Sequence, residues 1–192
     1  MIKKTLAIPR KRLVLEASFF SQLQGHCFGF SLCCLLQLQY PEHPILTQDV
    51  VADSQSLQRR YDENKENDGA IIDLPGLIER QSQVFSTAIR TIASQWSMAD
   101  FPEGLLERGP CVFYFALEGG DEGHAVYLDP GDLNRDAVIC DTHDPALHET
   151  LSVHVVQAVM IQKIMAYVSE KSPELLSGNL LLQTICYEKV VG

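Results

Sequence analysis

A continuous apolar segment near the N-terminus limits what this chain can fold into. Residues 27–40 read CFGFSLCCLLQLQY, and Pro41 and Pro44 follow them. The segment has the length of a helix, and proline cannot continue a helix, so we expect a helix over residues 25–40. Apolar side chains cover almost its whole circumference, which is typical of a helix that the rest of the protein surrounds. The sequence therefore predicts a fold built around one buried helix.

The segments that follow this helix also have helical patterns. Residues 50–71 are the most polar part of the chain, and we expect a helix there that ends in an exposed loop. The acidic run 61–68 is expected to belong to that solvated loop. Residues 74–96 carry apolar side chains at helical spacing, which predicts a further helix. Those side chains are Leu77, Val84, Ile89 and Ile92.

The C-terminal part of the chain has mainly the pattern of strands. Residues 111–118 are a short, wholly apolar run rich in aromatic side chains, which predicts a buried strand. Residues 123–131 and 136–145 each read as a strand closed by polar turn residues. Helical spacing returns over residues 148–170, and residues 179–191 predict a last strand.

Helices followed by a largely antiparallel sheet define an α+β fold. A chain of 192 residues suffices for one domain with a proper core, and no repeat, low-complexity segment or internal linker divides it. We therefore expect a single domain over residues 1–192, in which residues 1–16 form an extended arm.

Charge and hydropathy exclude several classes of protein. The formal net charge is -10 and no basic stripe is present, which argues against binding of nucleic acid. The basic N-terminal segment lacks the continuous apolar stretch of a signal peptide, and the longest apolar run is too short to span a bilayer. We therefore expect a soluble protein, either cytoplasmic or secreted by a route without a cleavable signal peptide.

The chain has six cysteines, and without a secretory signal we expect them to be reduced. Five of them lie within apolar helical or strand-like runs, where free cysteines usually pack as small hydrophobic residues. These five are Cys33, Cys34, Cys111, Cys140 and Cys186. Cys27 differs, because it stands where the expected buried helix begins.

This position makes Cys27 a candidate nucleophile. The N–H groups and the dipole at a helix N-terminus stabilise a thiolate, and so does a neighbouring imidazolium. The base must come from another element, and His124 is the natural candidate because it follows Gly123 at the start of an expected strand. A carboxylate on the next strand would fix the imidazole tautomer. Asp141 stands at the end of that strand, and Asp144 is the alternative acid.

A tetrahedral intermediate at Cys27 would need hydrogen-bond donors beside the nucleophile. The backbone N–H of Cys27 and a side-chain amide just upstream, Gln22 or Gln24, are the candidates for this oxyanion hole. His26 is a poorer base than His124, because neighbouring side chains on a helix point away from each other. It is expected to be a helix-start residue.

These motifs together resemble the papain-like cysteine proteases, and most of all the YopT-type family of bacterial effector proteases. The resemblance covers three short windows of the chain, GHCFGFS, GHAV and ICD. The residues that match the family's pattern are Gly25, Cys27, Gly29 and Ser31 around the nucleophile, His124 and Ala125 at the base, and Asp141 as the acid. The Asp-Pro-Asn-like turn of the family is matched only in part, because the sequence DTHDP delays the proline.

The resemblance implies a papain-like fold, with a central buried helix packed on a small, mostly antiparallel sheet, and a cysteine protease that acts through a thioester. It implies a protein substrate, such as a host protein, and no cofactor, and it leaves the oligomeric state undefined. The same triad suits a deamidase or an acyl transferase acting on amines, and the same fold suits a non-catalytic binding module. A small zinc protein on Cys140, His143 and His148 is a third alternative, although the spacing lacks a second pair of ligands.

Overall fold

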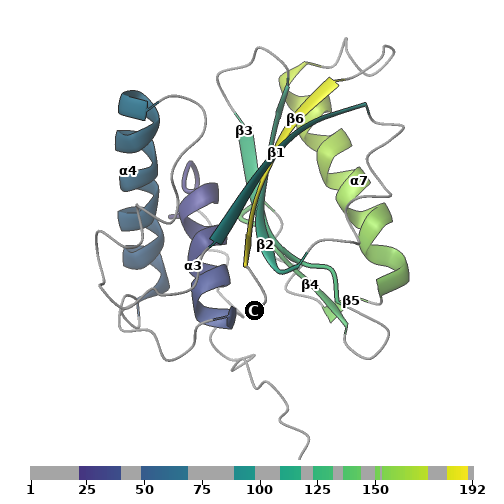
Figure 1. Cartoon of the computed structure of the whole chain (residues 1–192), viewed down its shortest axis with the longest axis horizontal. Coiled ribbons are helices and arrows are strands. Elements are labelled where there is room, and N and C mark those ends of the chain that lie inside the picture. The colour runs from purple at the N-terminus through teal and green to yellow at the C-terminus, as the bar shows by residue number, and fades with distance from the viewer. Residues whose placement is uncertain are drawn as a thin grey trace, which may run out of the picture.

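The computed structural model describes residues 22–39, 49–68, 89–97, 109–117, 123–131, 136–143, 150–151, 153–172 and 181–189 (Figure 1). These parts contain three helices and six strands. The helices are α3 (Cys27–Gln39), α4 (Val50–Asp68) and α7 (Val153–Lys171). The strands are β1 (Ile89–Ser97), β2 (Cys111–Leu117), β3 (Gly123–Asp129), β4 (Ala137–Cys140), β5 (Thr150–Leu151) and β6 (Leu181–Lys189). The expected N-terminal arm lies outside the described residues.

The six strands form one sheet in the order β1-β6-β2-β3-β4-β5, and every pairing in it is antiparallel. This confirms the expected α+β class and the antiparallel character of the sheet. Strands β2, β3 and β4 are neighbours in both sequence and space, as short polar turns between apolar runs predict. β3 therefore lies inside the sheet, and its partner on one side is β4, with Tyr127 opposite Cys140.

The helices cover both faces of the sheet. Figure 1 shows α3 between α4 and one face of the sheet, with α7 on the opposite face. Alternate residues of β2 and β3 divide between two hydrophobic cores, because successive side chains of a strand point to opposite faces. Val112 and Tyr127 belong to the core around α3, whereas Phe113 and Val126 belong to the core around α7.

Helix α3 is the buried central helix that its sequence predicts. Every residue at positions 28–36 is buried, and only the two ends of the helix reach solvent. The close packing of α3 on α4 depends on Gly29. A Cβ atom there would collide with the carbonyl oxygen of Ser54 and lie 2.6 Å from the backbone nitrogen of Gln58. The backbone N–H of Gly29 instead donates to Oε1 of Gln58 over 2.9 Å.

Two expectations about the segments before β2 were wrong. The acidic run 61–68 is helical, since α4 continues to Asp68. Residues 89–96 belong to strand β1 rather than to a helix, because they pair with β6 along their whole length. Their β-branched residues, Ile89, Thr91 and Ile92, favour a strand as much as their spacing favours a helix. Residues 69–88 lie outside the described part of the chain.

The C-terminal expectations were largely correct. Strands β2, β3, β4 and β6 lie within the four runs that predict them, and α7 begins inside the helical run 148–170 and ends one residue after it. The two-residue strand β5 was missed, because it precedes α7 inside a segment with helical spacing. None of the three described helices has the length and apolar character that crossing a lipid bilayer would require.

Candidate active site

A tight turn places Cys27 at the first position of α3. Gly25 has φ of 77°, a left-handed conformation that only glycine adopts readily, and it lies at the end of the turn formed by residues 22–25. The N–H of His26 then donates to the carbonyl of Leu23 over 2.9 Å, and the carbonyl of His26 accepts the N–H of Phe30. Cys27 follows as the first helical residue and is half-buried.

Two neighbouring strands bring His124 and Asp141 together. His124 is the second residue of β3, and Asp141 directly follows β4, which pairs with β3. Nε2 of His124 lies 2.9 Å from Oδ1 of Asp141, and the two residues are only 4% and 2% exposed. The sequence predicted this pair, and Asp141 is the carboxylate that His124 contacts. Asp144, the alternative acid, lies outside the described residues.

The Cys27 side chain lies close enough to His124 to affect the pKa of the imidazole. Because Asp141 occupies Nε2, the nitrogen that remains for the thiol is Nδ1. Burial works against the charged form of His124, but its hydrogen bonds and charge interactions with Asp141 and Cys27 raise its pKa from 6.5 to about 9. An imidazolium held next to a thiol favours the thiolate, which is the nucleophilic form of cysteine.

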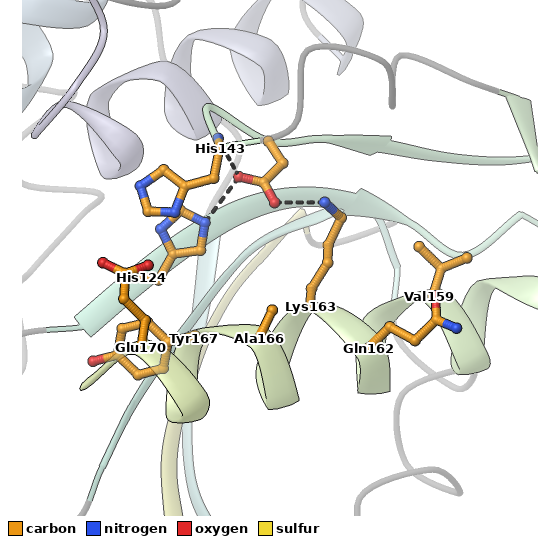
Figure 2. Close-up of a pocket in the computed structure, with 9 residues that line it drawn as sticks. His124, His143, Val159, Gln162, Lys163, Ala166, Tyr167 and Glu170 are labelled. Carbon is orange, nitrogen blue, oxygen red and sulfur yellow. Dashed lines mark hydrogen bonds and ion pairs between the residues drawn. The ribbon is translucent and has the colours of Figure 1, made fainter. Parts of the chain in front are cut away.

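The carboxylate of Asp141 receives three donors in all. Oδ1 also accepts the backbone N–H of His143 over 2.9 Å, and Oδ2 lies 2.6 Å from Nζ of Lys163 on α7 (Figure 2). Burial by itself would raise the pKa of Asp141, but the hydrogen bonds and charges of His124 and Lys163 hold it well below its usual range. Asp141 is therefore a carboxylate at every pH at which the protein would work.

Aromatic rings surround the His124 imidazole. The rings of His143 and Tyr167 lie nearly parallel to it, with centroids 4.2 Å and 6.4 Å away (Figure 2). The ring of Phe115 meets it edge-on at 5.5 Å. Burial and the positive charge of His124 lower the pKa of His143. Of the two stacked histidines, His124 therefore carries the proton near neutral pH, and His143 is neutral.

A pocket of about 400 Å³ opens beside this pair of residues. His124 and Asp141 line the pocket together with residues of α7, among them Lys163, Tyr167 and Glu170 (Figure 2). The described lining does not include Cys27. Since Cys27 and the pocket both adjoin His124, a ligand in the pocket would approach the imidazole from the α7 side.

Tyr114 lies close to Cys27 on the α3 side of the sheet. It packs against the same core as Cys27 and is linked to Tyr61 of α4 by a hydrogen bond. Burial, followed by the nearby Tyr167 and Cys27, raises the pKa of Tyr114 to about 12, so its hydroxyl stays protonated. Gly123 leaves the space that Tyr114 occupies, because a Cβ atom there would collide with the phenol oxygen.

The oxyanion-hole candidates have weaker support than the triad. Gln22 and Gln24 are both exposed in the turn before α3, and the carbonyl of Gln22 accepts a hydrogen bond from Gln55 over 3.4 Å. No described contact joins either side-chain amide to Cys27. The first N–H groups of α3 lie outside the helical i to i−4 ladder, so the backbone of Cys27 is the better candidate donor.

The structure also bears on the zinc alternative and the other cysteines. Within the described parts of the chain no group of three or more His, Cys, Asp or Glu side chains is arranged to hold a metal ion, and His148 lies outside them. The five cysteines whose side chains the structure describes are free thiols, and all of them except Cys27 are buried. Burial raises the pKa of Cys33 to about 12 and also raises that of Cys34.

Lys163, which contacts Asp141, was not singled out from the sequence, and His143 was considered only as a candidate metal ligand. A signal for Lys163 was present, because it is a single basic residue inside the apolar run VVQAVMIQKIMAYV. A lysine among residues that pack on a sheet is rarely buried unless it is paired. Its partner could not be read from the sequence, because Asp141 is 22 residues away.

No protein-family model, curated protein or solved structure that was compared with this chain matches it.

Proposed function

We propose that this protein is a papain-like cysteine hydrolase that uses Cys27, His124 and Asp141. The observation that carries the proposal is the 2.9 Å contact between the buried His124 imidazole and the Asp141 carboxylate, with the Cys27 thiol near enough to help raise the pKa of His124. A nucleophile, a base and a group that orients the base are the three parts that thiol catalysis requires. Buried titratable groups with strongly shifted pKa values are also commoner at active sites than elsewhere.

The arrangement of elements supports the papain-like character of this proposal. The helix that begins with the cysteine packs on one face of an antiparallel sheet, the histidine lies on one strand of that sheet, and the aspartate directly follows the adjacent strand. The resemblance of the three sequence windows points the same way. Bacterial effector activity on a host protein is the biological setting that this resemblance implies.

The proposed reaction has two steps. The Cys27 thiolate attacks the carbonyl carbon of an amide and forms a C–S bond, while His124 gives its proton to the leaving amine as the C–N bond breaks. His124 then takes a proton from water, and the hydroxide attacks the thioester and releases the carboxylic acid and the thiolate. Asp141 stabilises the imidazolium in the first step and fixes the ring in both.

A minimal acyl donor tests this proposal without knowledge of the natural substrate. With p-nitrophenyl acetate we expect a rapid burst of about one p-nitrophenolate per chain, followed by slower turnover, with the acetyl group found on Cys27 by mass spectrometry. The burst should disappear in Cys27→Ala and slow by about 10²-fold or more in His124→Ala. Acetylation spread over lysines without a burst would contradict the proposal. It would favour the non-catalytic binding module.

Peptide-bond cleavage is tested separately from acylation. Incubation with an unfolded protein such as casein, followed by mass spectrometry of new chain termini, detects hydrolysis of peptide bonds. A mass increase of about 1 Da at glutamine side chains would instead identify a deamidase, because the same thioester chemistry then acts on a side-chain amide. In either case the product must be absent with Cys27→Ala.

A further inference from the structure

The two oxygens of the Asp141 carboxylate are divided between two elements of the fold. Oδ1 faces His124 on β3, and Oδ2 faces the ammonium group of Lys163 on α7, 2.6 Å away. The Lys163 and Asp141 side chains are only 9% and 3% exposed. Figure 2 shows the lysine extending along the wall of the pocket from α7 to reach the carboxylate. Burial removes these two charged groups from water, and the desolvation cost can exceed the free energy gained from their attraction. Stability alone therefore does not explain why the pair is present.

We propose that Lys163 is a positioning residue of the active site, which holds the Asp141 carboxylate so that Oδ1 faces His124. The inference rests on the proposed function, because it assigns Lys163 a role in the same reaction. The contact that carries this assignment is the one between Lys163 Nζ and Asp141 Oδ2, so the proposed role is exerted through the carboxylate.

The location of Asp141 explains why a second anchor is needed. Asp141 follows a strand of only four residues, β4, and the turn after it contributes just the backbone N–H of His143 to Oδ1. Without a donor on Oδ2 the carboxylate is free to rotate about its Cβ–Cγ bond and to present either oxygen to the imidazole. Lys163 removes this freedom, because α7 packs on the sheet face that carries His124.

The charge of Lys163 has a separate and measurable effect. The groups that face His124 and Asp141 are Cys27 from α3, His143 from the turn after β4, and Lys163, Tyr167 and Glu170 from α7. Among these, Lys163 competes with the His124 imidazolium for the negative charge of Asp141. Removal of the ammonium charge should therefore make His124 hold its proton to a higher pH, since an opposing positive charge is lost.

The test measures the rate at which iodoacetamide alkylates Cys27 between about pH 5 and about pH 10, which brackets the His124 titration. The variants are Lys163→Met, which removes the charge and the donor, Lys163→Gln, which removes only the charge, and Lys163→Arg, which keeps both. Lys171→Met removes the same charge from the exposed end of the same helix and is the matched control.

In the wild type we expect the alkylation rate of Cys27 to stay constant up to the pH at which His124 loses its proton and to change there. This change on the alkaline side of the profile is the alkaline limb. Lys163→Met should move this alkaline limb upward by about half a pH unit, because a positive charge is lost. The p-nitrophenyl acetate burst should slow by about tenfold, because the carboxylate is no longer held in place. Lys163→Gln should show the same shift of the limb, so it decides the question if Lys163→Met does not fold. Lys163→Arg and Lys171→Met should leave the limb where it is.

The outcomes separate this inference from the proposed function. A purely structural lysine would change the folded fraction and leave the limb unmoved, so folded Lys163 variants with the wild-type profile and burst rate would overturn the inference. If the wild-type profile were identical to that of His124→Ala, no imidazolium would act on Cys27. That result would overturn the proposed function and the inference with it.

Discussion

At the scale of single residues, Asp141 is the centre of the proposed site. It accepts hydrogen bonds from His124, from the backbone of His143 and from Lys163, and it is almost fully buried. The charge that it supplies is the main reason why His124 remains protonated in a buried position. Loss of that charge should therefore affect the base more than it affects the fold.

We expect Asp141→Asn to slow acylation of Cys27 by about 10²- to 10⁴-fold, because the amide neither stabilises the imidazolium nor fixes its tautomer. The pKa of His124 should fall below its wild-type value of about 9. The p-nitrophenyl acetate burst measures the first effect, and NMR titration of the imidazole measures the second. Asp136→Asn, at an exposed position just before β4, is the matched control. Equal rates in the two variants would exclude Asp141 from the reaction.

The His124 ion pair also makes stability depend on pH. The pKa of His124 is raised from 6.5 to about 9 in the folded protein, so its charged interactions stabilise the fold fully below about pH 6.5. This contribution is lost as the pH rises through about 9. The difference in unfolding free energy between wild type and His124→Gln, measured with urea, should therefore shrink over this range. A difference that stays constant or grows would contradict the assigned charge state.

The three residues of the proposed triad could be chosen from the sequence because each stands at the boundary of a structural element. Cys27 begins a helix, His124 is the second residue of a strand and Asp141 directly follows one, and such boundaries are visible where an apolar run meets turn residues. Lys163 lies in the middle of a helix, where periodicity assigns a face but names no partner. Its contact with Asp141 depends on how α7 packs on the sheet, which local patterns do not encode.

At the scale of secondary-structure elements, the contact between α3 and α4 fixes where Cys27 lies. Gly29 is two residues after the nucleophile, and its missing side chain lets the backbone of α4 approach. Oε1 of Gln58 occupies the N–H of Gly29, and Nε2 of the same side chain donates to Asp62 over 2.9 Å. A change at Gly29 should therefore move the start of α3 relative to the sheet.

We expect Gly29→Ala to destabilise the protein by about 1–3 kcal/mol, because the new methyl group meets backbone atoms of α4 that cannot rotate away. Helix propensity alone predicts the opposite sign, since alanine is favoured over glycine in a helix by about 1 kcal/mol. Urea unfolding of the two proteins decides between these effects. A more stable Gly29→Ala protein would show that α3 and α4 are not packed this closely.

Strand β1 shows where element-scale prediction from sequence fails. Residues 89–96 have apolar side chains at helical spacing, yet they form an antiparallel pair with β6, which comes about 90 residues later in the chain. Hydrogen bonds to a distant strand satisfy the backbone groups that face it. They override the local preference of these residues for a helix or for a strand. By contrast, β2, β3 and β4 follow one another along the chain, so their turns were sufficient to predict their order.

At the scale of the whole molecule, the proposed site combines parts from both faces of the sheet. Cys27 comes from the α3 side and Lys163 from the α7 side, and His124 and Asp141 lie in the sheet between them. The α+β class and the buried helix could be predicted from patterns in the sequence. The packing of α7 against His124 could not, because it depends on which face of β3 each side chain takes and on the crossover from β5 to β6.

This arrangement predicts that the described cysteines differ sharply in reactivity. Cys33 and Cys34 are buried inside α3 with raised thiol pKa values, and Cys111 and Cys140 are buried in the sheet. Only Cys27, among the cysteines whose side chains the structure describes, is both accessible and next to an imidazolium. Among these five thiols, reactivity in the folded protein should therefore be confined to Cys27.

The rate of iodoacetamide alkylation at each cysteine of the native protein tests the central claim most directly. We expect Cys27 to react at least about 10-fold faster than Cys33, Cys34, Cys111 and Cys140 near neutral pH, because thiolate character and exposure control the rate. His124→Ala should remove most of this advantage, and full unfolding in urea should make the five thiols react alike. Slow, uniform labelling of the native protein, or a Cys27 rate that His124→Ala leaves unchanged, would contradict the assignment of Cys27 as the nucleophile.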